Sequence, residues 1–301
     1  MKRPHYIKPI IFLMLFFVFF SSFAQKEVDF QINLKVGDGF EVESVISQDG
    51  VSTDKNNPEH KNEITSRIQY HVEKKTPDFY SLNYMYTEYY MSMKIGKRDM
   101  VTNTKTADML NFLSPSTQIA MMMNKPFSAE LSQKGKVLSV KGNKDIEKEF
   151  KKKTKKFSPD LREQAYTMVN AIAGSEVLVN NIESWAMYIP SSIVKIGDKW
   201  SVEKDSALTY YTFTAETDST YIIEGVGSSK KTTNMEIQGM LMTTNTEEEF
   251  TITIEFNKHT FLPKVITKES EMSIQAEISG YPSLSNQSKS DVISTIKIRK
   301  L

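Results

Sequence analysis

The side chains best suited to binding chemistry lie in one segment, DFYSLNYMYTEYYMSMKI, residues 78–95. Met91 and Met93 are two residues apart, so in a strand both thioethers face the same side. Three roles fit the pair: filling of an irregular core, which we favour, contact with an apolar ligand, or ligation of Cu(I). A Cu(I) site would need further ligands, and no histidine lies near the pair in the sequence, so we predict no metal site. The candidate contacts of an apolar ligand are Tyr84, Tyr89, Met91 and Met93.

Residue types used in catalysis are present, but the sequence does not arrange them in a catalytic pattern. There is no Cys and no Gly-x-Ser-x-Gly motif, and the histidines at 60, 71 and 259 are too far apart for an HxxxH or HxH metal site. Paired carboxylates are the one catalytic alternative, because two acids at a fixed separation can hydrolyse a substrate. The acids concerned are Asp205, Glu216 and residues 247–249. Acids at strand ends are ordinarily solvated, so we predict that the protein is not an enzyme and has no cofactor.

The strongest charge feature is the lysine run KKKTKK, residues 151–156. Such a run fits contact with an anionic surface such as phospholipid or lipopolysaccharide. Glu147 and Glu149 precede the run and offset part of its charge. We favour the simpler interpretation, a solvated helix face or linker.

The first 24 residues have the three parts of a secretory signal peptide. Basic residues occupy the start, residues 10–20 are uniformly apolar, and Ser22 and Ala24 stand at positions −3 and −1 of a cleavage site. The apolar run is too short to cross a bilayer, which needs about 20 residues; an uncleaved anchor is the alternative. We expect a mature chain that starts at Gln25 and is exported, soluble, to the periplasm or the extracellular space.

Charge and cysteine content restrict the class of protein. Residues 1–24 contain three of the 38 basic residues and no acid, so the remaining chain has 35 basic and 37 acidic residues and a net charge of −2. This charge does not indicate a nucleic-acid partner. Because the sequence lacks cysteine, an exported chain must be stabilised by its core and not by disulfides.

Two regions of period-two patterning flank a helical middle. Residues 27–36 and 39–47 predict two strands joined by a Gly-Asp turn, 49–62 predict a polar loop, and a phase change at Glu88 predicts a bulge or a turn. The pattern predicts an α+β, mainly β fold: two related antiparallel curved β segments, half-barrel-like, joined by a central helical segment. We divide the chain into a signal peptide (1–24), an N-terminal β segment (25–142), a helical connector (143–188) and a C-terminal β segment (189–301).

A ten-residue phrase occurs twice, as LKVGDGFEVE (34–43) and as VKIGDKWSVE (194–203). Glycine accepts a positive φ and aspartate can hydrogen-bond its own backbone, so each phrase predicts a tight turn followed by an aromatic residue that starts a strand and is buried. The structural turn residues are Gly37, Asp38, Phe40, Gly197, Asp198 and Trp200. We interpret the repeat as internal duplication; the alternative is chance combined with common hairpin sequences.

The Gly-Asp phrase, the hairpin FSAELSQKGKVLSV, the helical middle and YIPSSIVKIGDKW occur in an order that resembles a known family. It is an uncharacterised, domain-of-unknown-function family of exported bacterial proteins, frequent in Bacteroidetes-type Gram-negative bacteria. The resemblance covers most of the mature chain and is strongest at residues 190–200. It implies an envelope location and a β-rich fold, and it supplies no catalytic residues and no substrate.

We therefore predict an exported, non-enzymatic protein that binds an apolar or lipid-like ligand in a Tyr- and Met-lined groove, by analogy with half-barrel lipid carriers. Its partner would be an apolar small molecule, a lipid or an envelope protein. The alternatives are a structural or interaction module of the envelope and a carboxylate-dependent hydrolase. A contiguous apolar groove favours the first function, a long uncovered edge strand the second, and two carboxylates facing across a cleft the third.

Overall fold

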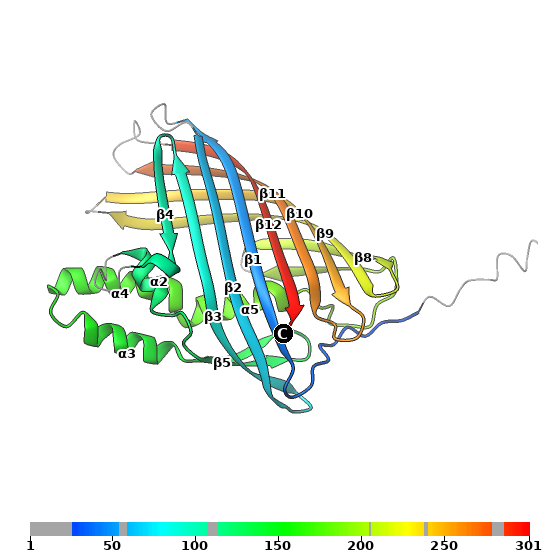
Figure 1. Cartoon of the computed structure of the whole chain (residues 1–301). Helices are drawn as coiled ribbons and strands as arrows, with labels where there is room; N and C mark the ends of the chain where they lie inside the picture. The colour runs from blue at the N-terminus through cyan, green and yellow to red at the C-terminus, as the bar shows by residue number, and fades with distance from the viewer. Residues whose placement is uncertain (1–25, 54–58, 108–113, 205, 238–239, 279–285) are drawn as a thin grey trace, which may run out of the picture.

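Alternating apolar and polar residues form long antiparallel strands that bury one face of a sheet. The computed structural model describes residues 26–53, 59–107, 114–204, 206–237, 240–278 and 286–301. Within these residues the strands form one 12-stranded sheet, in the order β6-β5-β3-β2-β1-β12-β11-β10-β9-β8-β7, with β4 paired to β3 (Figure 1). The strands are β1 Gly39–Ser52, β2 Glu59–Lys75, β3 Phe79–Ile95, β4 Arg98–Asn103, β5 Phe127–Ser132, β6 Val137–Lys141, β7 Lys199–Lys204, β8 Ala207–Glu216, β9 Thr220–Ile237, β10 Met240–Asn257, β11 Pro263–Ile278 and β12 Asn286–Lys300.

The expected mainly β, antiparallel architecture is confirmed, in a single open sheet. β1 pairs with β12 along its whole length, so the first and last strands of the chain join the two expected β segments in the middle of the sheet. β6 and β7 lie at the two ends of the strand order, and the sheet is strongly twisted and curved between them (Figure 1). The buried side chains of both halves belong to one continuous hydrophobic core.

Helices cover one face of this sheet (Figure 1). They are η1 Thr104–Thr106, α2 Pro115–Ala120, α3 Asn143–Lys153, α4 Pro159–Ala173 and α5 Ser175–Ala186. α5 makes the central contact, because the ring of its buried Trp185 meets the rings of Phe40 and Tyr70 edge-on, each at 5.4 Å. Such edge-to-face pairs stabilise a core beyond the area they bury.

The segment before β1 is extended but is not a strand, so the prediction of a strand at 27–36 was wrong. Its apolar side chains still alternate into the core, and Phe30 packs edge-on against Phe256 with ring centroids 5.3 Å apart. Its backbone, however, hydrogen-bonds to loop residues, as from Ile32 N to Gln133 O and from Asn33 N to Thr260 O, both 2.8 Å. The period-two pattern therefore indicated correctly which side chains are buried. It did not indicate that the backbone pairs as a strand of the sheet. The buried side chains are Val28, Phe30, Ile32 and Leu34.

Two local predictions on the long strands had different outcomes. The bulge is confirmed: Arg67 pairs with Glu88 and Ile68 with Tyr86, so Thr87 is the extra residue that exchanges the faces of β3. The prediction of a polar loop over the whole of 49–62 was wrong at both ends, because β1 continues to Ser52 and β2 begins at Glu59; residues 54–58 of the predicted loop lie outside the described residues. These polar strand ends are stabilised by their pairing with neighbouring strands, which a local pattern does not reveal.

The repeated phrase forms two turns of the same geometry. Gly37 and Gly197 have φ of 89° and 94°, in the left-handed region that favours glycine. In each turn the aspartate accepts a hydrogen bond from the residue three positions earlier, at 2.7 Å from Lys35 N to Asp38 Oδ2 and at 3.0 Å in the second turn. The expected turn chemistry is thus present twice.

The two turns also join the sheet in the same way. Gly37 N donates to Val72 O of β2 at 2.9 Å, and Gly197 N donates to Phe213 O of β8 at 2.7 Å. The aromatic residue of each phrase then stacks on a tyrosine of the same neighbouring strand. These stacked pairs are Phe40–Tyr70, with ring centroids 5.0 Å apart, and Trp200–Tyr211, at 5.7 Å. Phe40 is buried as expected, whereas Trp200 is only half-buried.

The N-terminal 25 residues, which carry the expected signal peptide, lie outside the described residues. Within the part of the chain that is described, no helix combines the length and the apolarity needed to cross a membrane.

Candidate ligand-binding groove

The helix-covered face of the sheet contains a groove whose floor comes from the central strands. Directly opposed residues of β12, β1, β2 and β3 share one face of the sheet. One such row across these strands is Ile296, Ser44, Ser66 and Tyr89; the next is Ser294, Ile46, Ile64 and Met91. Ser44 and Ser66 are small and lie side by side where neighbouring rows carry aliphatic residues. This pair of short side chains leaves space between the sheet and the helices above it.

The resulting first cavity has a volume of about 300 Å³, at the lower end of the usual range for ligand pockets. Most of its wall is aliphatic, aromatic or thioether. It is lined by Val42, Ser44, Ile46, Ile64, Ser66, Ile68, Tyr86, Tyr89, Ile119, Met122, Met123, Val177, Asn181, Ser184 and Ile296. β1, β2, β3 and β12 supply the floor, and α2 with the adjoining turn and α5 supply the cover.

The polar side chains of the first cavity are uncharged, and Tyr86, Asn181 and Ser184 are linked by hydrogen bonds. Asn181 Nδ2 donates to Tyr86 Oη at 2.8 Å, and Ser184 Oγ donates to Asn181 O at 2.8 Å. Burial raises the pKa of Tyr86 to about 12, and burial also raises the pKa of Tyr89. Both phenols are therefore neutral near pH 7, so the cavity suits an apolar ligand and offers a few hydrogen-bonding groups.

A second cavity of about 280 Å³ adjoins the first at α5, since Ser184 lines both. Its floor is aromatic, formed by Tyr211 of β8 and Phe250 of β10. Both rings lie against β9 where that strand has glycine: a Cβ on Gly225 would come within 2.8 Å of the Tyr211 ring, and one on Gly227 within 2.6 Å of the Phe250 ring. The glycines thus allow the rings to lie flat and leave the space above them open.

Two ion pairs border the second cavity. Lys268 Nζ lies 2.7 Å from Glu248 Oε1 and 4.1 Å from the centroid of the Phe250 ring. Lys204 Nζ lies 2.6 Å from Glu183 Oε2 of α5. The groove therefore passes from an uncharged first cavity to a second one with charged groups at its edge.

The structure separates the four residues predicted to contact a ligand. Tyr89 lines the first cavity, and its hydroxyl lies 3.9 Å from Met91 Sδ. Met91 and Met93 follow on the same inward face of β3, opposite Ile64 and Asn62 of β2. Tyr84 is in the core, 2% exposed, with its ring stacked between those of Tyr70 and Phe127 at 5.3 Å each.

The sequence reasoning did not identify Ser44, Ser66 or the glycines of β9 as residues of the groove. A weak signal existed, because Ser44 interrupts the inward positions Phe40, Val42 and Ile46 of an otherwise apolar series. A serine inside a period-two pattern does not show what lies above it. The residues that cover it, on α2 and α5, are more than 70 positions away in the chain.

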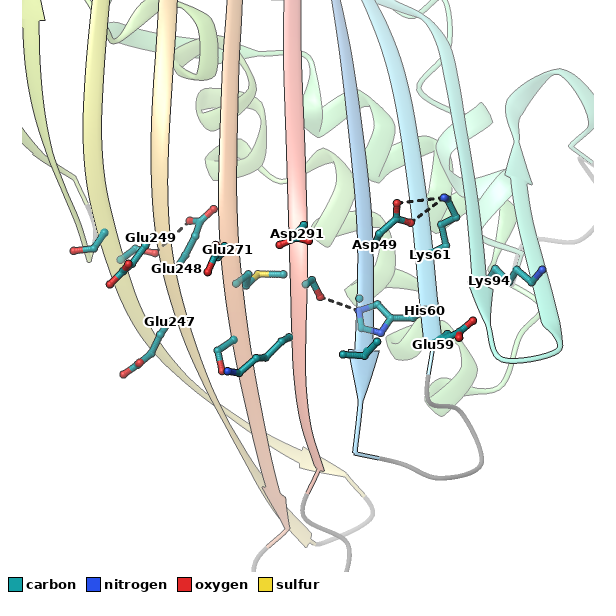
Figure 2. A pocket seen from close by; sticks show the side chains of 18 of the residues that line it. Asp49, Glu59, His60, Lys61, Lys94, Glu247, Glu248, Glu249, Glu271 and Asp291 are labelled. Carbon is teal, nitrogen blue, oxygen red and sulfur yellow. Dashed lines mark hydrogen bonds and ion pairs between the residues drawn. The ribbon is translucent and has the colours of Figure 1, made fainter.

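A third hollow, with a volume of about 830 Å³, lies near the end of β1 and the start of β2; Figure 2 shows it with the helices behind the strands. Four carboxylates, on the face opposite to the core residues, form a row in which neighbours are directly opposed. The row consists of Glu249, Glu271, Asp291 and Asp49, on β10, β11, β12 and β1. Like charges in direct opposition destabilise a sheet. Among the described residues, no group of three or more His, Cys, Asp or Glu side chains is placed to hold a metal ion.

The carboxylates considered for catalysis are mostly bound to lysines. Glu216 lies 2.5 Å from Lys258 Nζ, and the hydrogen bond from Lys258 is the main cause that lowers the pKa of Glu216. A general acid needs the opposite shift. Glu247 pairs with Lys230 at 2.8 Å and Glu248 with Lys268, while Asp205 lies outside the described residues.

The comparison with protein families supplies the identification. A model of the family of unknown function DUF6263 matches residues 77–263, more than half of the chain. The chain belongs to this family. The expected relationship to an uncharacterised, domain-of-unknown-function family is thereby confirmed.

Other comparisons give fold likenesses only. None of the curated proteins compared with the chain matches it. A lipovitellin structure solved for lipid–protein interactions is similar over 89% of this chain, with 9% identity and a TM-score of 0.47, and this chain spans 25% of that protein. The COG4313 outer membrane channel of Pseudomonas putida F1 covers 90% of this DUF6263 chain and matches over 98% of its own length, with 7% identity and a TM-score of 0.24. Neither likeness is close enough to carry a functional argument.

Proposed function

We propose that this DUF6263 protein is a non-enzymatic, exported binding protein whose groove holds an apolar or lipid-like ligand. One observation carries the proposal: the helix-covered face has an uncharged, aliphatic and tyrosine-lined cavity where two inward positions are serines. Burying apolar ligand surface contributes about 25 cal/mol for each Å² removed from water, so even a short acyl chain would gain several kcal/mol there.

The arrangement of the groove also supports an orientation for the ligand. Its apolar part would lie in the first cavity against Tyr89, with Met91 and Met93 extending the contact along β3. Methionine suits this role because its flexible thioether adapts to ligands of different shape. A polar end would face the second cavity, at whose edge the ion pairs Lys204–Glu183 and Lys268–Glu248 lie. Tyr84 would contribute indirectly, as a rigid core residue that holds β3 in place.

Export is part of the same proposal. A protein whose N-terminus has a basic start, an apolar run and the small residues Ser22 and Ala24 is expected to be cleaved after residue 24. We predict that protein purified from the envelope fraction of its native cell has the intact mass of a chain beginning at Gln25. Retention of Met1 in that mass would contradict the prediction.

We further propose that the sheet arose by duplication of a strand unit. The support is the pair of turns with the same φ, the same aspartate hydrogen bond and the same stacked aromatic pair. A second turn agrees with this: Thr76 N donates to Phe79 O and Thr217 N to Thr220 O, both at 2.9 Å. In each half this second turn begins four residues after the strand residue whose carbonyl accepts from the turn glycine: Thr76 follows Val72, and Thr217 follows Phe213.

Ligand binding is tested by closing the first cavity. Ser66→Leu should fill the space beside Ser44 and weaken binding of a fluorescent fatty acid to delipidated protein by at least about 10-fold, the effect of about 1.4 kcal/mol. Ser201→Leu is the matched control, since Ser201 is an exposed strand serine of β7 outside both cavities.

Native mass spectrometry of gently purified protein should in addition show a bound apolar molecule. The proposal fails if the parent protein carries no such molecule and binds no fatty acid saturably. Equal weakening by the two substitutions would also contradict it, because the effect would then not come from the cavity.

A further inference from the structure

The junction of α3 and α4 presents a concentrated basic surface, which we call the lysine tip: Lys151, Lys152, Lys155, Lys156 and Leu161. Four of these residues are lysines within six positions, and all five are exposed. In Figure 1 the α3–α4 junction lies at the outer end of the helical layer, away from the central strands. The tip therefore stands where a large flat partner could reach it.

The junction is ordered by hydrogen bonds to its own backbone carbonyl groups, mostly from side chains. Buried Thr154 closes the end of α3, with its N and its Oγ1 each 2.9 Å from Phe150 O. Arg162 of α4 then donates to two carbonyl oxygens of the connection, Lys155 O at 3.0 Å and Phe157 O at 3.1 Å. This arrangement holds the lysines on a fixed scaffold, so little backbone order has to be gained when a partner binds.

Interactions within the protein account for only some of the lysines at the tip. Lysines in the last turn of α3 interact favourably with the helix dipole, and Lys151 and Lys153 pair with Glu147 and Glu149 at 4.0 and 2.9 Å. Lys155 and Lys156 lie beyond the helix end. Within the described part of the chain, neither they nor Lys152 have an acidic side chain within 4.0 Å.

An apolar side chain accompanies the charge. Leu161, in the first turn of α4, is 40% exposed and lies within five residues of Lys156. Lysines beside an exposed leucine are typical of surfaces that bind anionic lipid headgroups and insert shallowly among them. An anionic lipid surface would repel the carboxylate row, which lies on the sheet face opposite to the core residues and consists of Glu249, Glu271, Asp291 and Asp49.

We infer that the lysine tip docks this protein on an anionic phospholipid bilayer, with the carboxylate row turned away from it. This inference does not depend on what the groove binds. Each lysine near such a surface strengthens binding by roughly 5-fold, and the effect decays within a Debye length, about 10 Å at 0.1 M salt. Four lysines therefore suffice for measurable association at low salt and for its loss at high salt.

The test is co-sedimentation of the mature protein with vesicles of phosphatidylcholine containing 30% phosphatidylglycerol, compared with pure phosphatidylcholine. The parent protein should bind the anionic vesicles only, and 0.5 M NaCl should release it. The quadruple variant K151Q/K152Q/K155Q/K156Q should bind at least about 50-fold more weakly. The matched control K97Q/K199Q/K264Q/K297Q removes the same charge from exposed lysines elsewhere and should bind like the parent.

Several outcomes would overturn the inference. Unchanged binding by the tip variant, an equal loss in the control variant, or equal binding to pure phosphatidylcholine would each show that the lysine tip does not dock on anionic lipid. Binding to lipopolysaccharide micelles but not to phosphatidylglycerol vesicles would overturn the choice of partner. Thermal unfolding followed by circular dichroism should show that all variants melt like the parent, since the substituted side chains are exposed.

Discussion

At the scale of single residues, the size of a side chain at an inward position decides whether the sheet face is core or cavity. Ser44 and Ser66 leave space, whereas Phe40 and Tyr70, further along the same two strands, fill it. The two tryptophans of the sequence also differ in how deeply their side chains are buried. Trp185, on α5, is fully buried, and Trp200 is half-buried with an Nε1 that has no partner among the described residues.

We predict that Trp185→Ala lowers the free energy of unfolding by about 3–5 kcal/mol, because it removes a buried ring and its contacts with Phe40 and Tyr70. Trp200→Ala should lower it by clearly less, since part of that ring is already exposed to water. Urea unfolding followed by circular dichroism measures both values. Equal losses, or a larger loss for Trp200→Ala, would show that Trp185 does not anchor the core.

At the scale of elements, the two Gly-Asp turns act as equivalent starting points for β1 and β7. Each glycine has a positive φ and no atom within 4 Å of the position of an added Cβ. Strain in the backbone is therefore the main cost of a side chain there. Gly225 in β9 is the opposite case, because its added Cβ would come within 2.7 Å of Ile252 and 2.8 Å of Tyr211.

Gly37→Ala and Gly197→Ala should each cost about 1–2 kcal/mol of stability, the penalty of a Cβ in the left-handed region. The two losses should agree within about 0.5 kcal/mol if the turns are equivalent. Gly225→Ala should cost more and should also disturb the second cavity, by displacing the Tyr211 ring. Chemical denaturation of the three variants provides the comparison, and clearly unequal losses at Gly37 and Gly197 would argue against duplicated units.

At the scale of the whole molecule, charge is distributed unevenly between the two faces of the sheet. The helical layer carries the lysine tip, and the opposite face carries the row of four opposed carboxylates (Figure 2). Among the described residues, Asp49 is the only member of that row with a lysine Nζ within 4.0 Å, that of Lys61 on the neighbouring strand, at 3.1 Å. The carboxylates of the row therefore repel one another, and added salt or substitution of one carboxylate should reduce this repulsion.

We predict that Glu271→Gln raises the free energy of unfolding by about 0.2–1 kcal/mol at low ionic strength, since Glu271 is opposed by carboxylates on both sides. The gain should shrink in about 0.5 M NaCl, where screening shortens the range of the repulsion. Glu269→Gln is the matched control, because Glu269 has the same strand and face but is opposed by Thr251 and Ile293. A gain that is equal in both variants, or that does not respond to salt, would contradict the account.

Features that depend on neighbours along the chain could be predicted from the amino-acid sequence. These were the alternation of β1 and β3, the bulge that exchanges faces near Glu88, and the two Gly-Asp turns. Each follows from local geometry: a period of two, one extra residue, and a φ that only glycine adopts readily. The prediction of an uncharacterised family rested on the order of such local motifs.

How distant segments meet could be learned only from the folded molecule. Residues 27–36 alternate like a strand, but their backbone partners are loop residues about 100 and 230 positions away. Polar residues 49–52 and 59–62 form strands because β12 and β3 pair with them. Likewise, Tyr84 and Tyr89 have the same local character, yet one is stacked in the core and the other lines a cavity. Burial and pairing depend on what lies opposite in space, and long-range contacts supply that information.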